Sequence, residues 1–327
     1  MKARRTRRLG LGLLTAAGAT VLATLTGGAP SAWAGAAGGE PSNSRGGSGA
    51  AAAQRVKADF DGDGKADFAV WRPSSGTWFV LRSSDGGQTI RQYGQVGDVA
   101  VPADFDGDGK TDFAVWRPSS GTWFVLRSSD GGQSIQQYGS FANDVAAPAD
   151  VDGDGRADFV IWRPSNGTWY ALRSSDGGQT TQVYGQTGDV AVPADYDGDG
   201  KADFAVWRPS NGVWFALRSS DRKESIRQYG QAGDVAVPAD YGGDGKADFA
   251  VWRPSNGTWF ALRSSDDGQS IRQYGQTGDV AVPADFDGDG KADFAVWRPS
   301  NGTWYALRST DGGQTIRQYG QSGDIPV

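Results

Sequence analysis

The 327-residue chain contains 50 glycines and 13 tryptophans but no cysteine and no histidine, which excludes disulfide bonds, thiolate zinc sites and cysteine nucleophiles and removes the commonest general base. Residues 1–34 hold five basic and no acidic side chains, so residues 35–327 hold 27 basic and 38 acidic ones, a net charge of −11. A chain this acidic is a poor candidate for binding nucleic acid, where cationic side chains must neutralise phosphates, and we predict no nucleic-acid partner.

Residues 1–34 have the pattern of a bacterial export signal. A basic start at residues 2–8 precedes an uncharged, largely apolar run at residues 9–25, and Ala32-Trp33-Ala34 fits a cleavage site. A membrane anchor is the alternative, but the run is short for a spanning helix and is diluted by small residues and threonine. We predict a secreted, extracellular protein that is cleaved after Ala34 and has no membrane span after cleavage. Export by the Sec route and by the twin-arginine route both stay open.

The segment after the signal differs in composition from everything that follows it. Residues 35–55 are rich in glycine, alanine and serine and have no hydrophobic period, which predicts a flexible linker. We therefore divide the chain into a signal peptide at 1–34, a linker at 35–55 and a six-repeat region at 56–327.

The repeat region consists of six copies of one unit. Its acidic loops begin at residues 59, 104, 150, 195, 240 and 285, a period of 45 or 46 residues. Each unit has four short runs of β-branched and aromatic residues, separated by Gly, Ser, Asn, Asp and Pro, and no run has helical periodicity. In the first unit, residues 68–71 and 78–81 are apolar at every position, which is typical of strands covered on both faces.

Four strands per unit, a period of 45 residues and six units predict an all-β fold, a six-bladed β-propeller of four-stranded antiparallel blades. The last residues, Gly323-Asp324-Ile325-Pro326-Val327, match the opening of a unit at 97–101, and the first unit lacks that opening. We predict that the C-terminal strand completes the first blade and closes the ring, which leaves no long free edge. An open solenoid and a ring closed by a second chain are the alternatives.

The loop of the first unit reads Asp59-Phe60-Asp61-Gly62-Asp63-Gly64-Lys65-Ala66-Asp67. Carboxylates at positions 1, 3, 5 and 9, with a main-chain carbonyl at position 7, can surround a hard cation with oxygens at roughly 2.3–2.6 Å. The loop resembles the start of an EF-hand, but Val70 stands at position 12, where an EF-hand has a bidentate glutamate. An Asp-Gly turn is the alternative. Converging carboxylates repel each other without a cation, so we predict Ca²⁺, with Mg²⁺ disfavoured by its strict octahedral geometry.

One loop departs from the pattern, because Gly242 replaces the carboxylate at position 3 of the fifth unit. We predict five strong Ca²⁺ sites and a sixth site, at 240–248, that is weak or empty. The predicted ligands, with Lys or Arg at position 7 acting through its carbonyl, are Asp59, Asp61, Asp63, Lys65, Asp67, Asp104, Asp106, Asp108, Lys110, Asp112, Asp150, Asp152, Asp154, Arg156, Asp158, Asp195, Asp197, Asp199, Lys201, Asp203, Asp240, Asp244, Lys246, Asp248, Asp285, Asp287, Asp289, Lys291 and Asp293.

The units resemble FG-GAP (VCBS-type) repeats, the blades of integrin α-subunit propellers and of many exported bacterial proteins. Tyr93-Gly94 stands where the family has Phe-Gly, and residues 59–67 match its calcium loop, but only Pro73 remains of its Gly-Ala-Pro triplet. The resemblance covers about residues 56–327. It implies a propeller with calcium in the loop that joins the first two strands of each blade, and it implies binding or adhesion more than catalysis.

Aromatic and basic residues recur in every unit. Twelve of the 13 tryptophans lie in the repeats, two per unit, and we predict that they fill the core between blades and are not sugar-stacking platforms. We expect the arginines equivalent to Arg72 and Arg82 to pair with aspartate or stack on tryptophan, although they could bind anions. The Asn-Gly-Thr sequons, such as the one at 166–168, are interpreted as tight turns. Residues 72–76 and 93–98 are expected on the face opposite the acidic loops, which is our first candidate for a ligand surface.

The repetition of the units favours binding over catalysis. Enzyme sites need convergent and chemically distinct groups, and the departures at 140–143, 221–224 and Gly242 make no recognisable constellation. We predict that the chain is not an enzyme, has no catalytic residues and acts as a monomeric, non-catalytic extracellular binding, adhesion or scaffold module for a protein or glycan ligand. A multivalent carbohydrate-binding lectin is the alternative, and a polysaccharide-active enzyme on a propeller is less favoured.

Overall fold

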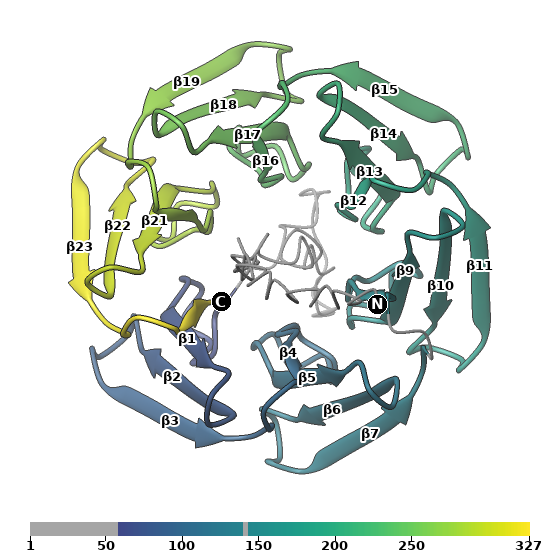
Figure 1. Ribbon diagram of the computed structural model, residues 1–327, viewed down its shortest axis with the longest axis horizontal. Helices are drawn as coiled ribbons and strands as arrows, with labels where there is room; N and C mark the ends of the chain where they lie inside the picture. Colours follow the sequence, from purple (N-terminus) through teal and green to yellow (C-terminus); the bar gives the residue numbers. More distant parts are fainter. Residues whose placement is uncertain (1–57, 140–142) are drawn as a thin grey trace, which may run out of the picture.

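The computed structural model describes residues 58–139 and 143–327. The predicted signal peptide at 1–34, the linker at 35–55 and residues 140–142 of the irregular segment 140–143 lie outside the described residues. Within the described ranges the chain forms 24 strands and no helix. The strands make six four-stranded antiparallel sheets, arranged as blades around a ring (Figure 1). The predicted six-bladed β-propeller is therefore confirmed.

Each blade has a short innermost strand followed by three strands of five residues. Blade 1 combines β24 (Ile325–Pro326) with β1 (Phe68–Arg72), β2 (Thr77–Leu81) and β3 (Gln88–Gln92). Blade 2 contains β4 (Val99–Ala100), β5 (Phe113–Arg117), β6 (Thr122–Leu126) and β7 (Gln133–Gln137), and blade 3 contains β8 (Val145–Ala146), β9 (Phe159–Arg163), β10 (Thr168–Leu172) and β11 (Gln179–Val183). Blade 4 contains β12 (Val190–Ala191), β13 (Phe204–Arg208), β14 (Val213–Leu217) and β15 (Glu224–Gln228). Blade 5 contains β16 (Val235–Ala236), β17 (Phe249–Arg253), β18 (Thr258–Leu262) and β19 (Gln269–Gln273), and blade 6 contains β20 (Val280–Ala281), β21 (Phe294–Arg298), β22 (Thr303–Leu307) and β23 (Gln314–Gln318).

Burial decreases from the second strand of a blade to the outermost one. In β1 the residues Ala69, Val70 and Trp71 are all fully buried, because neighbouring blades cover both faces of this strand. β2 alternates between buried and half-buried residues, and β3 is mostly exposed. The polar sequence of the outermost strand therefore suits its position on the rim.

The ring closes within one chain. β24 pairs with β1 through Val70↔Pro326 and Trp71↔Ile325, so the last residues complete the first blade. Figure 1 shows the yellow C-terminal strand against the purple β1. The main-chain N–H of Val327 donates to the carbonyl of Ala69 at 2.9 Å, which extends the pairing by one bond. The predicted closure by the C-terminal strand is confirmed.

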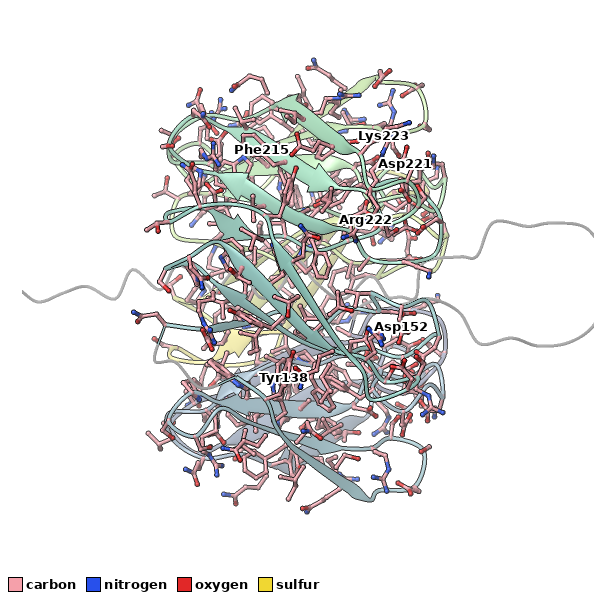
Figure 2. The ribbon with its side chains drawn as sticks, turned by 90° about the vertical axis from the view of Figure 1, so that its right-hand side faces the viewer. Tyr138, Asp152, Phe215, Asp221, Arg222 and Lys223 are labelled. Atoms are coloured by element: carbon pink, nitrogen blue, oxygen red, sulfur yellow. The ribbon has the colours of Figure 1, made fainter. Side chains whose placement is uncertain are left out.

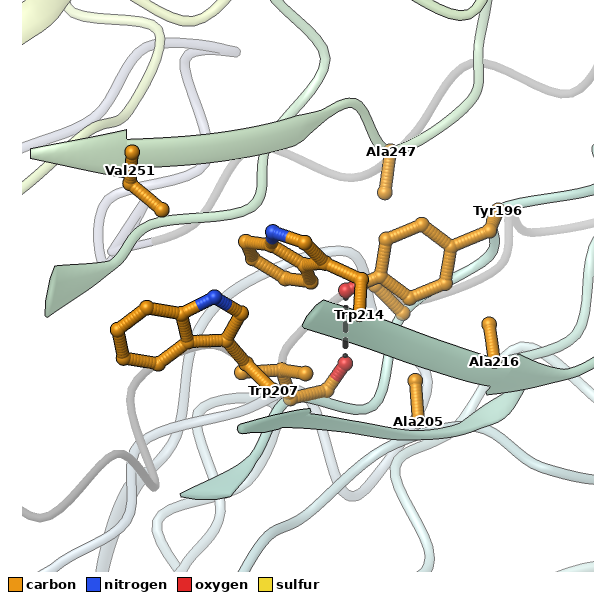
Figure 3. Close-up of a cluster of buried hydrophobic side chains, with 9 residues drawn as sticks. Tyr196, Ala205, Trp207, Trp214, Ala216, Ala247 and Val251 are labelled. Atoms are coloured by element: carbon orange, nitrogen blue, oxygen red, sulfur yellow. Dashed lines mark hydrogen bonds between the residues drawn. The ribbon is translucent and has the colours of Figure 1, made fainter. Parts of the chain in front are cut away.

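The tryptophans form the core of the blades. All twelve repeat tryptophans are at most 2% exposed, so none offers a face to a sugar, and the core interpretation is confirmed. In blade 4, Trp207 and Trp214 pack in one cluster with Val251 of blade 5 (Figure 3). The indole N–H of Trp214 donates to the carbonyl of Tyr229 at 2.8 Å, which satisfies its polar group inside the core.

A pair of stacked rings connects most neighbouring blades. Phe60, the second residue of the first acidic loop, stacks on Phe113 at the start of β5, with ring centroids 4.9 Å apart. The third loop has Val151 at this position, so the contact between blades 3 and 4 lacks this stack. The other four stacks are Phe105 on Phe159 at 5.3 Å, Tyr196 on Phe249 at 4.9 Å, Tyr241 on Phe294 at 5.0 Å and Phe286 on Phe68 at 4.8 Å.

Candidate metal sites on the acidic-loop face

Each acidic loop lies where the sequence predicts it, between the first two strands of its blade, and the loops share one face of the ring. We call this the acidic-loop face. Figure 2 shows the ring edge-on, with Asp152 of the third loop and Asp221 of a neighbouring turn on the same, right-hand side. The turn between the third and fourth strands, residues 82–87 in blade 1, lies on this face as well, because it contacts the acidic loop.

Two glycines give the acidic loop its shape. In the first loop, Gly62 and Gly64 have φ angles of 82° and 86°, in the left-handed region that favours glycine. The resulting bend turns main-chain N–H groups inward, and both glycines donate to the carboxylate of Asp59, at 2.6 and 2.9 Å. The same two bonds recur in the other five loops. The carboxylate at position 1 is therefore fixed inside its loop.

The aspartate at position 9 is fully buried in every loop. Asp67 is fully buried, and its two oxygens accept N–H groups of Phe60 at 2.9 Å and Ser83 at 2.7 Å. Burial disfavours the charged form and raises the pKa of Asp67 to about 6. Burial likewise raises the pKa of its counterparts to about 6 or 7; these are Asp112, Asp158, Asp203, Asp248 and Asp293. A bound cation acts in the opposite direction, because it favours the charged carboxylate.

Serine hydroxyl groups from the turn between the third and fourth strands orient the remaining carboxylates. Ser84 donates its hydroxyl to Asp61 at 2.6 Å, and Ser83 donates its hydroxyl to Asp63 at 2.8 Å. Equivalent bonds occur in blades 2, 3, 4 and 6, with Thr310 replacing the second serine in blade 6. We did not predict these residues from the sequence, although the Arg-Ser-Ser-Asp segment that carries them is repeated in almost every unit.

Five of the six loops bring three carboxylates together. One oxygen from each member lies within 4.8 Å of one oxygen from each of the other two, in the groups Asp59–Asp61–Asp67, Asp104–Asp106–Asp108, Asp150–Asp152–Asp158, Asp195–Asp197–Asp199 and Asp285–Asp287–Asp289. Oδ1 of Asp287 is buried and has no hydrogen-bond partner among the described residues. An all-oxygen donor set with an unpartnered buried carboxylate oxygen fits a hard cation, so the residues present are suited to calcium.

Some predicted ligands lie outside these groups. Position 5 is in three of the groups and position 9 in the other two. At position 7, the main-chain N–H of Lys65 donates to Asp63 at 2.9 Å, and the coordination of a cation by the carbonyls at this position stays a prediction. The fifth loop, at 240–248, forms no such group within the described part of the chain. There the N–H of Gly242 donates to Asp248 at 3.1 Å. The number of occupied sites also stays a prediction.

Hydrogen bonds connect the six acidic loops in a closed circle. The N–H of Thr111 in the second loop donates to the main-chain carbonyl of Asp59 in the first, at 2.7 Å. Each following loop repeats this bond, and Ala66 of the first loop donates to Asp285 of the last, also at 2.7 Å. Each position-7 side chain lies over the loop before it, because a Cβ atom on Gly62 would meet Lys110 at 2.6 Å. The φ angle of 82° requires glycine at position 4, and the missing Cβ atom also leaves room for the lysine or arginine side chain of the next loop.

The opposite face carries a second repeated arrangement. Arg117 forms a bidentate ion pair with buried Asp98, at 2.7 and 2.9 Å, and its guanidinium lies 4.2 Å from the ring centroid of Phe124. All six blades have this ion pair and ring contact. The expected pairing with aspartate is confirmed, but the expected stacking on tryptophan is wrong, because the ring is a phenylalanine or tyrosine on the other face of the strand. In the Arg82 series, Arg82 itself pairs with exposed Asp85.

The profile of the FG-GAP-like repeat family matches four overlapping segments of the chain, residues 59–115, 104–161, 150–206 and 195–251. These segments begin at the first four acidic loops and together span more than half of the chain. The predicted resemblance is therefore confirmed. A search of curated proteins finds no match to this sequence.

Several solved structures have a similar fold. One is a lectin from Agrocybe aegerita that recognises non-reducing terminal N-acetylglucosamine, with 15% identity and a TM-score of 0.53 over 79% of this chain and 77% of the lectin. Another is TolB from Acinetobacter baumannii, with 15% identity and a TM-score of 0.54 over 80% of this chain and 65% of TolB. At such low identity these similarities establish the fold alone.

The comparisons correct one prediction. The sequence led us to predict that the chain is not an enzyme, but similar structures include a virginiamycin B lyase from Staphylococcus aureus, at 10% identity and a TM-score of 0.44 over 80% of this chain and 86% of the lyase. That exclusion of catalysis is dropped, because a fold does not determine function and the repetition of the blades does not by itself exclude an active site. In the two described ranges, the structure has no helix of the length and hydrophobicity that a membrane span requires.

Proposed function

This chain belongs to the family of FG-GAP-like repeat proteins, and we propose that it is a secreted calcium-binding β-propeller that acts as an extracellular binding or adhesion module. The observation that carries the proposal is the group of three carboxylates that recurs in five loops of the acidic-loop face. Such groups are costly without a cation, because burial and mutual repulsion both disfavour the charged carboxylates. The proposal therefore assigns the charge of the loops to metal binding.

The donor set supports calcium over other metals. The chain has no histidine or cysteine, so only oxygen ligands are present, and these suit hard cations. Calcium accepts 6–8 oxygens in flexible geometry, whereas magnesium requires a near-ideal octahedron and keeps its waters. In the first loop, Asp59, Asp61, Asp63 and Asp67 would hold the ion together with the carbonyl of Lys65. The ion supplies the positive charge that lets these carboxylates lie close together.

The charge balance supports the same proposal. Five calcium ions carry +10, and residues 35–327 have a net charge of −11, so the loaded protein is nearly neutral and its loops no longer repel each other. The signal pattern at residues 1–34 supports export to the extracellular space, where calcium is abundant. We propose that the chain is a monomer and that its ligand is an extracellular protein or glycan. Residues 72–76 and 93–98 and their equivalents, opposite the acidic loops, are the candidate ligand surface.

Calorimetry and thermal melts test the calcium proposal. Titration of the calcium-depleted protein should give about five binding events per chain, and millimolar calcium should raise the melting temperature, because an ion bound only by the folded state stabilises it. Equal melting temperatures in EDTA and in calcium would refute the proposal.

A separate experiment tests the ligand-binding part. The calcium-loaded protein is applied to a glycan array and to a panel of extracellular matrix proteins, each with calcium and with EDTA. Saturable binding that disappears in EDTA supports a binding or adhesion module. Binding to neither panel argues against it, whatever the calcium titration gives.

A further inference from the structure

The outermost strands of the six blades differ in charge at one position. The fourth residue of each strand is arginine in four blades and glutamine in the other two. The arginines are Arg91 on β3, Arg227 on β15, Arg272 on β19 and Arg317 on β23, and the glutamines are Gln136 on β7 and Gln182 on β11. Blades 4, 5, 6 and 1, which carry the arginines, follow one another around the ring because the C-terminal strand closes the ring at blade 1 (Figure 1). We call these four residues the arginine arc.

The arginines of the arc are exposed and have no ion-pair partner among the described residues. Arg91 donates to the main-chain carbonyl of Ile90 at 3.2 Å, and the other three make the equivalent bond at 2.9, 3.0 and 3.1 Å. The two arginine series that all six blades share are paired, as Arg72 is with Asp324 and Arg82 is with Asp85. The arc therefore places guanidinium groups on the rim whose charge no neighbouring side chain balances.

Acidic side chains are nearly absent from the outermost strands. Within the described ranges, every exposed aspartate lies in an acidic loop or in the turn between the third and fourth strands. Glu224, at the acidic-loop end of β15, is the single acidic residue on an outermost strand. An arginine of the arc stands three residues further along its strand, roughly 10 Å away from that end. Exposed charges at such a distance are largely screened at physiological salt, so the acidic-loop face does not keep an anion from the arc.

Each arginine of the arc has an exposed isoleucine on the facing side of the next blade. Arg91 pairs across strands with Trp78, whose ring contacts Phe113 of blade 2, so Arg91 lies on the side of β3 that is turned to blade 2. On blade 2, Ile135 pairs with Phe124, which packs against the tryptophans of blade 1. Ile135 is 60% exposed. The other combinations are Arg227 with Ile271, Arg272 with Ile316 and Arg317 with Ile90, and these isoleucines are 48%, 48% and 50% exposed.

The spacing of the arginines selects the size of the ligand. One exposed ion pair changes an affinity only about two- to fivefold, so a small anion on one arginine gains little. A single chain that reaches several blades binds its second and third arginine at a high effective concentration, and its overall affinity rises accordingly. A ligand that uses the arc is therefore a polymer with repeated acidic groups.

The side chains around the arc favour a polysaccharide among such polymers. Sulfate or carboxylate groups pair with guanidinium, and the C–H faces of sugar rings pack on aliphatic side chains such as Ile90. Single-stranded nucleic acid is instead bound by stacking on exposed aromatic rings. Among the described residues, the exposed large apolar side chains are all isoleucine or valine.

We propose that the arginine arc binds an acidic polysaccharide that runs along the rim across blades 4, 5, 6 and 1. Its sulfate or uronate groups pair with the four arginines, and its sugar rings pack on the exposed isoleucines. No bond is made or broken. The proposal rests on the binding function proposed above and names the class of ligand. The arc borders the candidate ligand surface, because Arg91 stands two residues before the segment 93–98.

The test is a titration of the calcium-loaded full chain with dextran sulfate and with uncharged dextran of the same length, followed by calorimetry. Hyaluronate replaces sulfate with carboxylate and identifies which acidic group is preferred. We expect saturable binding of at least one of the two acidic polymers, weaker binding as salt rises, and no binding of dextran. A sulfated disaccharide cannot reach two blades and should not bind saturably.

Variants that follow the chain's own repeat locate the site. Arg227→Gln introduces the residue that blades 2 and 3 have at this position, so it should fold, and it should weaken binding about two- to fivefold. The same change at all four arginines should weaken binding more than about tenfold. Lys223→Gln is the matched control, because it removes the same charge from the same blade but on the acidic-loop face, and it should leave the affinity unchanged. Gln136→Arg extends the arc to blade 2 and should tighten binding.

Three results would overturn the proposal. The first is the absence of binding to both acidic polymers, and the second is an equal loss in Arg227→Gln and Lys223→Gln. The third is tighter binding of polyglutamate or single-stranded DNA than of either polysaccharide. The panels of glycans and matrix proteins keep the two proposals apart: a chain that binds a neutral glycan or a protein but no acidic polysaccharide retains its binding function and loses only the arc.

Discussion

Restoring the missing carboxylate of the fifth loop should create a sixth calcium site. The change is Gly242→Asp, which gives this loop an aspartate at position 3 like the other five. A Cβ atom at Gly242 would lie 3.1 Å from the hydroxyl oxygen of Ser265 and 3.8 Å from Oδ1 of Asp240. Ser265 occupies the position of Ser84, whose hydroxyl orients Asp61 in the first loop. The turn between β18 and β19 therefore already holds the hydroxyl donor that the new carboxylate needs.

The size of the effect follows from the binding free energy of one added site. With calcium at 10 to 100 times the dissociation constant, one site stabilises the folded state by about 1.4–2.7 kcal/mol. For a domain of this size, that corresponds to a rise in melting temperature of about 3–11 °C. Without calcium the sign reverses, because the new charge is added beside Asp240 and Asp244. For partly exposed charges this costs about 1 kcal/mol and lowers the melting temperature by about 2–4 °C.

Calorimetry and thermal melts of three variants separate charge from shape. Gly242→Asp should raise the calcium stoichiometry by one, whereas Asp61→Gly in the first loop should lower it by one. Gly242→Asn adds a side chain of the same size without the charge, so it should neither add a strong site nor lower the calcium-free melting temperature through repulsion. The reasoning is refuted if Gly242→Asp has the stoichiometry of wild type, or if it is stabilised equally with and without calcium.

Three further predictions concern the pH dependence of stability, the serine that orients Asp61, and ring closure. The pKa of Asp67 and its counterparts is about 6 or 7 in the calcium-free folded protein and 3.8 when unfolded, so the folded state binds more protons and its stability falls as pH rises from about 4 to 7. Calorimetry should therefore find the calcium-depleted protein more stable at pH 5 than at pH 8. The affinity for calcium should be weaker at pH 5. A calcium-free protein that is more stable at pH 8 would contradict the raised pKa values. Ser84→Ala removes the hydroxyl that donates to Asp61 at 2.6 Å. In a calcium titration this variant should weaken one site about tenfold without changing the stoichiometry. Loss of the whole site would instead show that Ser84 is itself a ligand. Asp324→Ala leaves Arg72 without its bidentate partner and should cost about 3 kcal/mol of unfolding free energy in urea. Asp85→Ala removes an exposed partner and should cost much less; equal costs would refute a special role of the buried pair in closure.

The period of the sequence determined most of what could be predicted. Six equal units with four strands each have few arrangements that cover every sheet, and the match of residues 323–327 to the start of a unit predicts how the ring closes. The register of β1 and β2 explains the one wrong contact. Arg72 shares a face with Val70 and therefore with Phe79, whereas Trp71 and Trp78 share the other face. Strict alternation along the strand, applied to Arg72, would have excluded tryptophan as its partner.

The carboxylate groups were predictable only in part, because their geometry depends on contacts between segments that no local pattern specifies. The spacing of the aspartates predicts convergence, and five loops converge. The hydroxyl groups of Ser83 and Ser84 come from a turn about 20 residues later in the chain. They are brought to the loop by the hairpin of β1 and β2, so their role is visible only once the strands are paired.

The circle of hydrogen bonds gives the proposed calcium ions a structural role beyond their own loops. The carbonyl of Asp59 accepts a bond from the next loop, while its carboxylate belongs to the predicted ligands of its own loop. An ion that fixes Asp59 therefore also fixes the acceptor for the second loop, and the same holds around the ring to Asp285 and Ala66. A ring in which each loop supports its neighbour is opened most easily where one support is weak. By this argument the loop at 240–248, which lacks a carboxylate, makes the contact between blades 5 and 6 the first to open when calcium is removed.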